Sequence, residues 1–346
     1  MSDGRDLSPR EAAERWLDRR RPDVRDSTLS TLWYRLKLFV EYCEREGFDS
    51  IRDIDGWDID EYQLHRHQNA KPLTLNKELG TLRQWLEYCV SIGVVDEAVP
   101  TAVEIPDVDP ADRSDDTMLP PERGEALLSW YRDSPQRASR PHALLEIFWT
   151  VGCRSGALRS LDVRDFNADE QWLRFEHRPE TGTELKKGRR GERYVGLLDE
   201  PTAVLAEFLD RERMDISDRY GRSPLIPSEA GRPATSTIRD WCYLATVPCK
   251  HGPCPHENDP ASCEYLSYVT ASGCPSSRSP HQVRTGSITW QLSRGVPIEV
   301  IADRVNSSPD TIEEHYDKED PRRELEVRRR GHLDALSLDD DTRTHE

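Results

Sequence analysis

The segment "SPHQVRTGSITWQLSRGVPIEVIADRVNSSPDTIEEHYDK", residues Ser279 to Lys318, decides how the second half of this chain is interpreted. Its pattern predicts three helices. Ser308 or Asp310 fits the cap of the last helix, and Pro309 fits its first turn. Tyr316 ends that helix and would either pack against its neighbours or present its hydroxyl for chemistry. The helices are expected at 281–294, 297–305 and 309–316.

Three other features of the sequence bear on the role of this tyrosine. His281 and Arg284 are three residues apart at a helix start, and therefore on one face. Arg154 lies in "TVGCRSGALRSLDVRDF", at a Gly-flanked turn that begins a helix. The runs "QWLRFEH" and "RYVGLL" flank "RPETGTELKKGRRGE", which predicts a hairpin or a three-stranded sheet bearing Lys186 and Lys187. Each residue alone is usually a surface or packing residue, so their order along the chain is the stronger signal.

The order Arg, hairpin Lys, His-x-x-Arg and then Tyr resembles the tyrosine recombinase (phage integrase) family. "TVGCRSGALRSLDVRD" is similar to the family's first arginine box, T-G-L-R-x-x-E-L-x-x-L, and residues 280–318 are similar to its second box and nucleophile segment. The resemblance implies a mainly α protein with two domains. These are an N-terminal four-helix core-binding (SAM-like) domain and a mixed α+β catalytic domain with a small antiparallel sheet. It also implies a site-specific recombinase that acts on double-stranded DNA as a homotetramer, with no cofactor for catalysis.

The resemblance assigns a role to each residue of the series. Tyr316 would attack a DNA phosphate to form a 3′-phosphotyrosine and release a 5′-hydroxyl. Arg154 and Arg284 would neutralise the charge on the non-bridging oxygens. Lys187, with Lys186 as the close alternative, would donate a proton to the leaving oxygen. Because each step exchanges one phosphate ester for another, the same site could reseal the strand.

Two positions depart from the family pattern, and a further role is left with two alternatives. His281 would act as a general base toward the tyrosine or would stabilise the phosphate. The acidic residue that the family places three positions after its first arginine is Ala157 here, and Asp162 or Asp165 is the candidate substitute. The family's His or Trp before the tyrosine segment is replaced by Asn306, which can donate a hydrogen bond but carries no charge.

Composition is compatible with this function. The chain has 346 residues, enough for two domains, and a net charge of −17. Of its 48 basic residues 41 are Arg, and this acidic, Lys-poor composition resembles that of proteins from salt-loving archaea. At molar salt the Debye length is about 3 Å, so net charge does not exclude DNA binding. No apolar run is long enough to span a membrane, and the first residues lack a signal region, so a cytoplasmic protein is predicted.

The chain divides by composition into several parts. The first hundred residues predict four amphipathic helices, the first beginning at the capping box "SPRE". The Pro-rich and acidic stretch that follows is typical of an extended linker. Together with the helical domain, it suggests a C-shaped clamp around duplex DNA. The predicted boundaries are a core-binding domain at 1–100, a linker at 101–119, a catalytic domain at 120–331 with an insertion at 249–274, and an acidic tail at 332–346.

The insertion "CKHGPCPHENDPASCEYLSYVTASGC" concentrates potential metal ligands in a loop with little apolar content. Thiolates and imidazoles could hold a structural tetrahedral Zn²⁺, although the spacing is not that of a standard CxxC pair. Two disulfides, or buried thiols without a metal, are the alternatives. The candidate ligands are Cys249, Cys254, Cys263 and Cys274, with His256 competing with Cys249 for the fourth place.

Two other functional classes compete with the recombinase. The stretch "IEVIADRVNSSPDTIEEHY" also fits a helix-turn-helix whose second helix would enter the major groove, which would make the protein a DNA-binding regulator without catalysis. That hypothesis leaves Arg154, Lys187 and His281 without a role. A zinc-stabilised protein-interaction module is the third class, and it depends on the cysteines alone.

Overall fold

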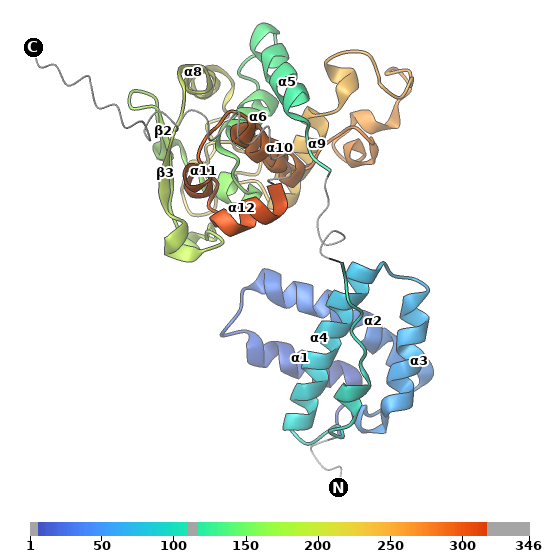
Figure 1. Ribbon diagram of the computed structural model, residues 1–346. Coiled ribbons are helices and arrows are strands. Elements are labelled where there is room, and N and C mark those ends of the chain that lie inside the picture. Colours follow the sequence, from blue (N-terminus) through green and yellow to red (C-terminus); the bar gives the residue numbers. More distant parts are fainter. Residues whose placement is uncertain (1–5, 110–116, 317–346) are drawn as a thin grey trace, which may run out of the picture. The chain divides into compact units, whose positions relative to one another are not determined.

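The computed structural model describes residues 6–109 and 117–316, without the side chains of residues 314–316. The described residues form two compact units, 6–109 and 117–316, and each has its own hydrophobic core. Figure 1 shows the helices and strands of both units. No helix within the described residues combines the length and apolarity that a membrane crossing requires.

The N-terminal unit is a bundle of four helices, as predicted. The capping box of Ser8 and Glu11 is formed at the start of the first helix, and Gly47, at φ +83°, ends the second in the left-handed conformation. The inward faces meet in an aromatic centre in which Phe39 packs edge-on against Tyr62 and Trp85. The helices are α1 (Pro9–Arg20), α2 (Asp26–Glu46), α3 (Gly56–His67) and α4 (Pro72–Ser91).

The chain after α4 remains attached to this bundle for some distance. Val99 and Val103 are buried in the bundle core. The Gln63 side chain holds the backbone there, because its amide donates to the Ala102 carbonyl at 3.1 Å and its oxygen accepts from the Glu104 amide at 2.6 Å. The first residues of the predicted linker therefore lie against the N-terminal unit.

The second unit is mainly α with one small antiparallel sheet, which confirms the predicted fold class. The strands are β1 (Phe166–Asn167), β2 (Trp172–Phe175) and β3 (Arg193–Gly196), in the order β1-β2-β3, with Leu173 opposite both Phe166 and Val195. The helices are α5 (Pro121–Asp133), α6 (Arg140–Val151), α7 (Ser155–Ser160), α8 (Asp199–Glu207), α9 (Thr235–Ala245), α10 (Pro280–Ser293), α11 (Ile298–Val305) and α12 (Pro309–Tyr316).

Helix α6 is the centre of this unit, and α5, α8, α9 and α10 pack around it (Figure 1). Nine of its twelve residues are buried. Two glycines allow its neighbours to approach closely. A Cβ atom on Gly286 of α10 would overlap the Leu119 carbonyl oxygen, and one on Gly124 of α5 would overlap the Trp149 ring. This packing fixes α10, which carries His281 and Arg284, against the end of α6.

Candidate active site

Two of the predicted arginines meet at the C-terminal end of α11. Arg154, the residue just before α7, donates from Nη1 to the Asn306 carbonyl at 2.6 Å. Arg284 of α10 is only 2% exposed and donates from Nη1 to the carbonyls of Val305 at 2.7 Å and Gly152 at 2.6 Å. Carbonyls in the last turn of a helix lack helical partners and carry partial negative charge, so they favour cations. The end of α11 therefore holds two guanidiniums close together.

A third arginine, which the sequence analysis did not single out, binds the preceding carbonyl. Arg193, at the start of β3, donates from Nε to the Arg304 carbonyl at 2.8 Å, and its Cζ lies 4.1 Å from the Phe175 ring centroid. The pKa of Arg193 is lowered to about 10, chiefly by burial, and the nearby Arg284 and Arg154 contribute to the lowering. Three consecutive carbonyls, those of residues 304, 305 and 306, thus accept from three different guanidiniums. We call this arrangement the α11 carbonyl cluster.

The hairpin between β2 and β3 brings the predicted lysines to the same place. The pKa of Lys186 is lowered. The positive charge of Arg154 is the largest cause, followed by burial and by the charges of Arg284 and Lys187. Lys186 therefore lies within electrostatic range of both predicted arginines. Lys187 is exposed and immediately precedes the short turn Gly188–Gly191. A lysine whose pKa is lowered is better suited to donate a proton near neutral pH, and on this ground Lys186 competes with the preferred Lys187.

Asn306 lies between the hairpin and the arginines. It adopts a left-handed conformation, φ 53° and ψ 60°, which ends α11 and which Asn tolerates better than most residues. Its amide passes close to the hairpin, since a Cβ atom added to Gly191 would lie 2.7 Å from Asn306 Nδ2. Asn306, which stands where the family has a His or Trp, thus lies beside Arg154 and the hairpin. Its backbone carbonyl accepts from Arg154, and its side-chain amide is next to Gly191.

His281 and Tyr316 complete the predicted set. His281 is exposed in the first turn of α10, whose start is capped by Ser279 and Gln282. Tyr316 is the last residue of α12, and its side chain lies outside what the structure describes. The helix itself is anchored beside α11, because Ile312 is fully buried in a cluster with residues of α10 and α11.

Comparison with known proteins concerns the sequence and the fold. No family model matches the sequence, and no curated protein matches it. Among solved structures, the N-terminal domain of a phage integrase/site-specific recombinase from Haloarcula marismortui is 44% identical, covering 29% of this chain and 98% of that one, with a TM-score of 0.29. The chain belongs to the tyrosine recombinase (phage integrase) family.

The similarity in fold between this tyrosine recombinase and solved integrase structures covers nearly the whole chain. The Tn1549 transposon integrase in complex with a circular intermediate DNA is 15% identical with a TM-score of 0.63, covering 95% of this chain and 100% of that one. A lambda integrase dimer bound to a COC′ core site is 12% identical with a TM-score of 0.59, covering 94% of this chain and 79% of that one. At these identities the two comparisons establish the shared fold.

The recombinase uses its candidate acidic residues elsewhere in the fold. Asp165 is 1% exposed and receives both terminal nitrogens of Arg178, at 2.6 and 2.7 Å. Asp162 is 2% exposed and accepts from Arg222 at 2.9 Å and also from Arg232. These pairs tie the chain after α7 to the hairpin and to residues 222–232. A backbone carbonyl, that of Asn306, supports Arg154, and sequence reasoning missed it.

The Cys-rich insertion is only partly assembled as a ligand group. All eight cysteines are free, and the Cys254 thiol shares a hydrogen bond with the Cys249 thiol. The backbone N–H of His256 lowers the pKa of Cys254, whereas burial raises the pKa of Cys249. Cys274 is buried in a small apolar cluster. In residues 6–109 and 117–316, no group of three or more His, Cys, Asp or Glu side chains is arranged to hold a metal ion.

Proposed function

We propose that this protein is a site-specific DNA recombinase that cuts and rejoins duplex DNA through a 3′-phosphotyrosyl intermediate. The observation that carries the proposal is the convergence of Arg154 and Arg284 on the α11 carbonyl cluster, with Lys186 in electrostatic range. Helix α12, which ends at Tyr316, packs directly against α10 and α11. The convergence of Arg154, Lys186 and Arg284, which come from three separate segments, supports a phosphate-binding position near the end of α12.

The proposed reaction balances without an external energy source. The Tyr316 oxygen attacks the scissile phosphorus, the bond from phosphorus to the 5′-oxygen breaks, and the 5′-oxygen takes a proton from Lys186 or Lys187. His281 accepts the tyrosine proton or donates to a phosphate oxygen. In the second half, a 5′-hydroxyl attacks the phosphotyrosine and releases the tyrosine. The ester energy is conserved, so neither metal nor ATP is consumed.

The arginines would stabilise the charge that develops on the phosphorus oxygens. An arginine has five N–H donors in a planar fork, and this geometry matches a phosphate better than a lysine does. The backbone carbonyls hold each guanidinium from one edge, so less reorganisation is needed when the phosphate arrives. Such preorganisation is usually the largest electrostatic contribution to catalysis.

The protein also presents a basic surface on the hairpin that suits its proposed DNA partner. Lys186, Lys187, Arg189 and Arg190 are all exposed on the hairpin segment. They can pair with backbone phosphates, which position DNA without reading its sequence. A homotetramer and a clamp around the duplex remain predictions that accompany this function.

A covalent trap tests the proposal. A duplex with a nick near the scissile phosphate, or with a bridging phosphorothiolate, prevents resealing, and we expect the wild-type protein to accumulate as a DNA adduct. Tyr316→Phe should abolish the adduct while DNA binding persists. Tyr194→Phe is the matched control, because Tyr194 is 63% exposed on β3 and should leave adduct formation unchanged.

Either of two results would contradict the proposal. An adduct formed by Tyr316→Phe would exclude this tyrosine as the nucleophile. The trap duplex can be taken from the DNA that flanks the protein's own gene. If the wild type binds this DNA tightly but forms no adduct, the helix-turn-helix regulator is favoured instead.

A further inference from the structure

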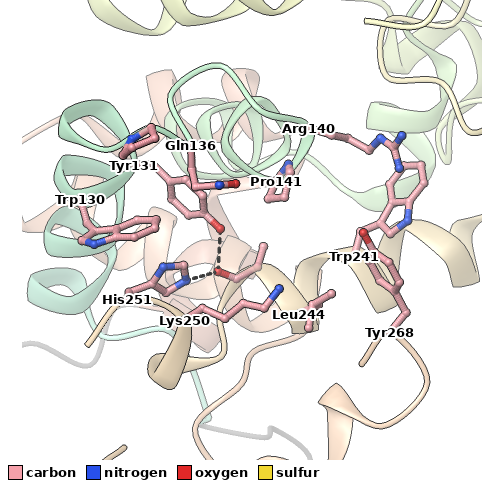
Figure 2. Close-up of a pocket in the computed structure, with 12 residues that line it drawn as sticks. Trp130, Tyr131, Gln136, Arg140, Pro141, Trp241, Leu244, Lys250, His251 and Tyr268 are labelled. Atoms are coloured by element: carbon pink, nitrogen blue, oxygen red, sulfur yellow. Dashed lines mark hydrogen bonds between the residues drawn. The ribbon is translucent and has the colours of Figure 1, made fainter. Parts of the chain in front are cut away.

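Figure 2 shows a pocket of about 460 Å³. It lies at the start of α6, whereas Arg154 and Arg284 lie beyond the end of this helix. Val151, the last residue of α6, precedes the Gly152 carbonyl that Arg284 binds, whereas Arg140 at its first turn lines the pocket. A helix of this length spans about 18 Å, so the pocket is separate from the proposed active site. Its walls come from the end of α5, the start of α6, the second half of α9 and the Cys-rich insertion.

Five of the twelve residues that line the pocket carry aromatic rings. Figure 2 shows Trp130, Tyr131 and His251 on one side and Trp241 and Tyr268 on the other. Several of these rings are held in place. Tyr131 is 3% exposed and its hydroxyl donates to the Ala245 carbonyl at 3.3 Å, while Trp241 is 7% exposed beneath Arg140, whose Cζ lies 4.7 Å from the ring centroid. A preformed pocket with rigid aromatic faces favours a flat aromatic ligand.

The polar groups of the pocket are cationic. Arg140 and Lys250 line it, none of its twelve lining residues is acidic, and within the described chain neither cation has an ion-pair partner. Such a pair of cations without acids is unexpected in a chain with 65 acidic and 48 basic residues.

His251 adds an acceptor to this set. Its Nε2 lies 2.8 Å from the Ala245 carbonyl, and since a carbonyl can only accept, the proton is on Nε2 and the lone pair is on Nδ1. Nδ1 is buried without a hydrogen-bond partner in the described part of the chain. Buried polar atoms in this state are rare and often mark a place for a ligand or an ordered water.

We propose that this pocket binds a small aromatic anion, a flat ring that carries a phosphate, carboxylate or sulfonate group. The ring would stack between the aromatic walls, and the anionic group would pair with Arg140 and Lys250. The volume falls within the usual range for small-ligand sites and accommodates a nucleoside monophosphate. The insertion supplies Lys250, His251 and Tyr268, so forming this wall is a role for it that does not depend on strand transfer.

Calorimetric titration of the full-length protein tests this proposal with three probes. Adenosine monophosphate and 8-anilinonaphthalene-1-sulfonate represent a nucleotide and a non-nucleotide aromatic anion, and adenosine is the uncharged comparison. We expect at least one anion to bind one site per chain at concentrations below about 1 mM. Adenosine should bind at least about tenfold more weakly than the monophosphate, since it lacks the group that pairs with the cations.

The double variant Arg140→Gln with Lys250→Gln should weaken that binding about tenfold or more. Arg239→Gln is the matched control, because Arg239 lies on α9 outside the pocket and pairs with Asp240. Circular dichroism establishes that each variant is folded. Absence of saturable binding by both anions, equal affinity in the double variant, or adenosine binding as tightly as its monophosphate would each overturn the proposal.

Discussion

Arg193 occupies an unusual position for a charged side chain. Its Nε and Nη1 donate to the carbonyls of Arg304 and Gly191, yet Nη2 is buried without a hydrogen-bond partner in the described residues. A buried unpaired N–H group costs about 1–3 kcal/mol. Features that cost stability are expected at functional sites. We infer that Arg193 is a positioning residue, which holds the last turn of α11 so that its carbonyls can hold Arg154 and Arg284.

Arg193→Gln should lower the rate of covalent adduct formation at least about tenfold, because the α11 carbonyl cluster loses one of its three guanidiniums. DNA affinity should change little, and Arg193→Lys should restore part of the rate by donating to the same carbonyl. Single-turnover kinetics on the trapped substrate, with binding measured in parallel, checks both statements. Arg189→Gln, an exposed change on the same hairpin, should affect affinity rather than rate. Equal losses of rate and affinity in Arg193→Gln would contradict a positioning role.

At the scale of elements, α5 and α6 are joined by a buried charged group. Glu146 is fully buried, receives Arg132 in two hydrogen bonds at 2.7 and 3.0 Å, and contacts His142 Nε2 at 3.1 Å. Burial alone would raise the pKa of Glu146. The hydrogen bonds from His142 and Arg132 outweigh it and lower the pKa below its ordinary value. The ionised carboxylate therefore stabilises the fold.

This group predicts a pH dependence of stability. Because the folded pKa of Glu146 is lowered, its contribution is present above the ordinary Glu pKa of about 4.3 and is lost as pH falls toward the folded value. Glu146→Gln should destabilise the protein by about 2–4 kcal/mol near pH 7 and by less near pH 3, since a buried pair is broken. Urea unfolding across this range measures the difference. Glu122→Gln, an exposed change on α5, should show almost none.

The Cys-rich insertion carries a second prediction at this scale. We still expect one zinc ion per chain, bound by Cys254, Cys263 and Cys274 with Cys249 or His256 as the fourth ligand, and the contact between the Cys249 and Cys254 thiols is compatible with this set. Elemental analysis of purified protein should find one zinc, and Cys254→Ser should remove most of it. Cys43→Ala, in the N-terminal unit, should retain the metal. Protein without zinc whose insertion thiols titrate freely would rule out the site.

At the scale of the whole molecule, the net charge of −17 opposes DNA binding at low salt, whereas the hairpin offers a local basic surface. Each phosphate contact releases counterions, so the logarithm of the binding constant falls linearly with the logarithm of salt concentration. The double variant Arg189→Gln with Arg190→Gln should reduce the steepness of this dependence by about 2. Arg211→Gln should leave the slope unchanged, because Arg211 is paired with Glu207. An unaltered slope in the double variant would remove the hairpin from the DNA interface.

The sequence by itself determined the family, the order of the elements and the candidate residues of the site. Helix starts, Gly-terminated helix ends and strand alternation are local signals, so they predicted the four N-terminal helices and the hairpin between α7 and α8. The tertiary structure decided what holds Arg154. The position where the family has an acidic residue near this arginine is Ala157 here, and the Asn306 carbonyl accepts a hydrogen bond from Arg154. Every residue has a carbonyl, so residue identities do not reveal which carbonyl faces a guanidinium. Only the packing of α11 against α10, β3 and the turn before α7 selects those three.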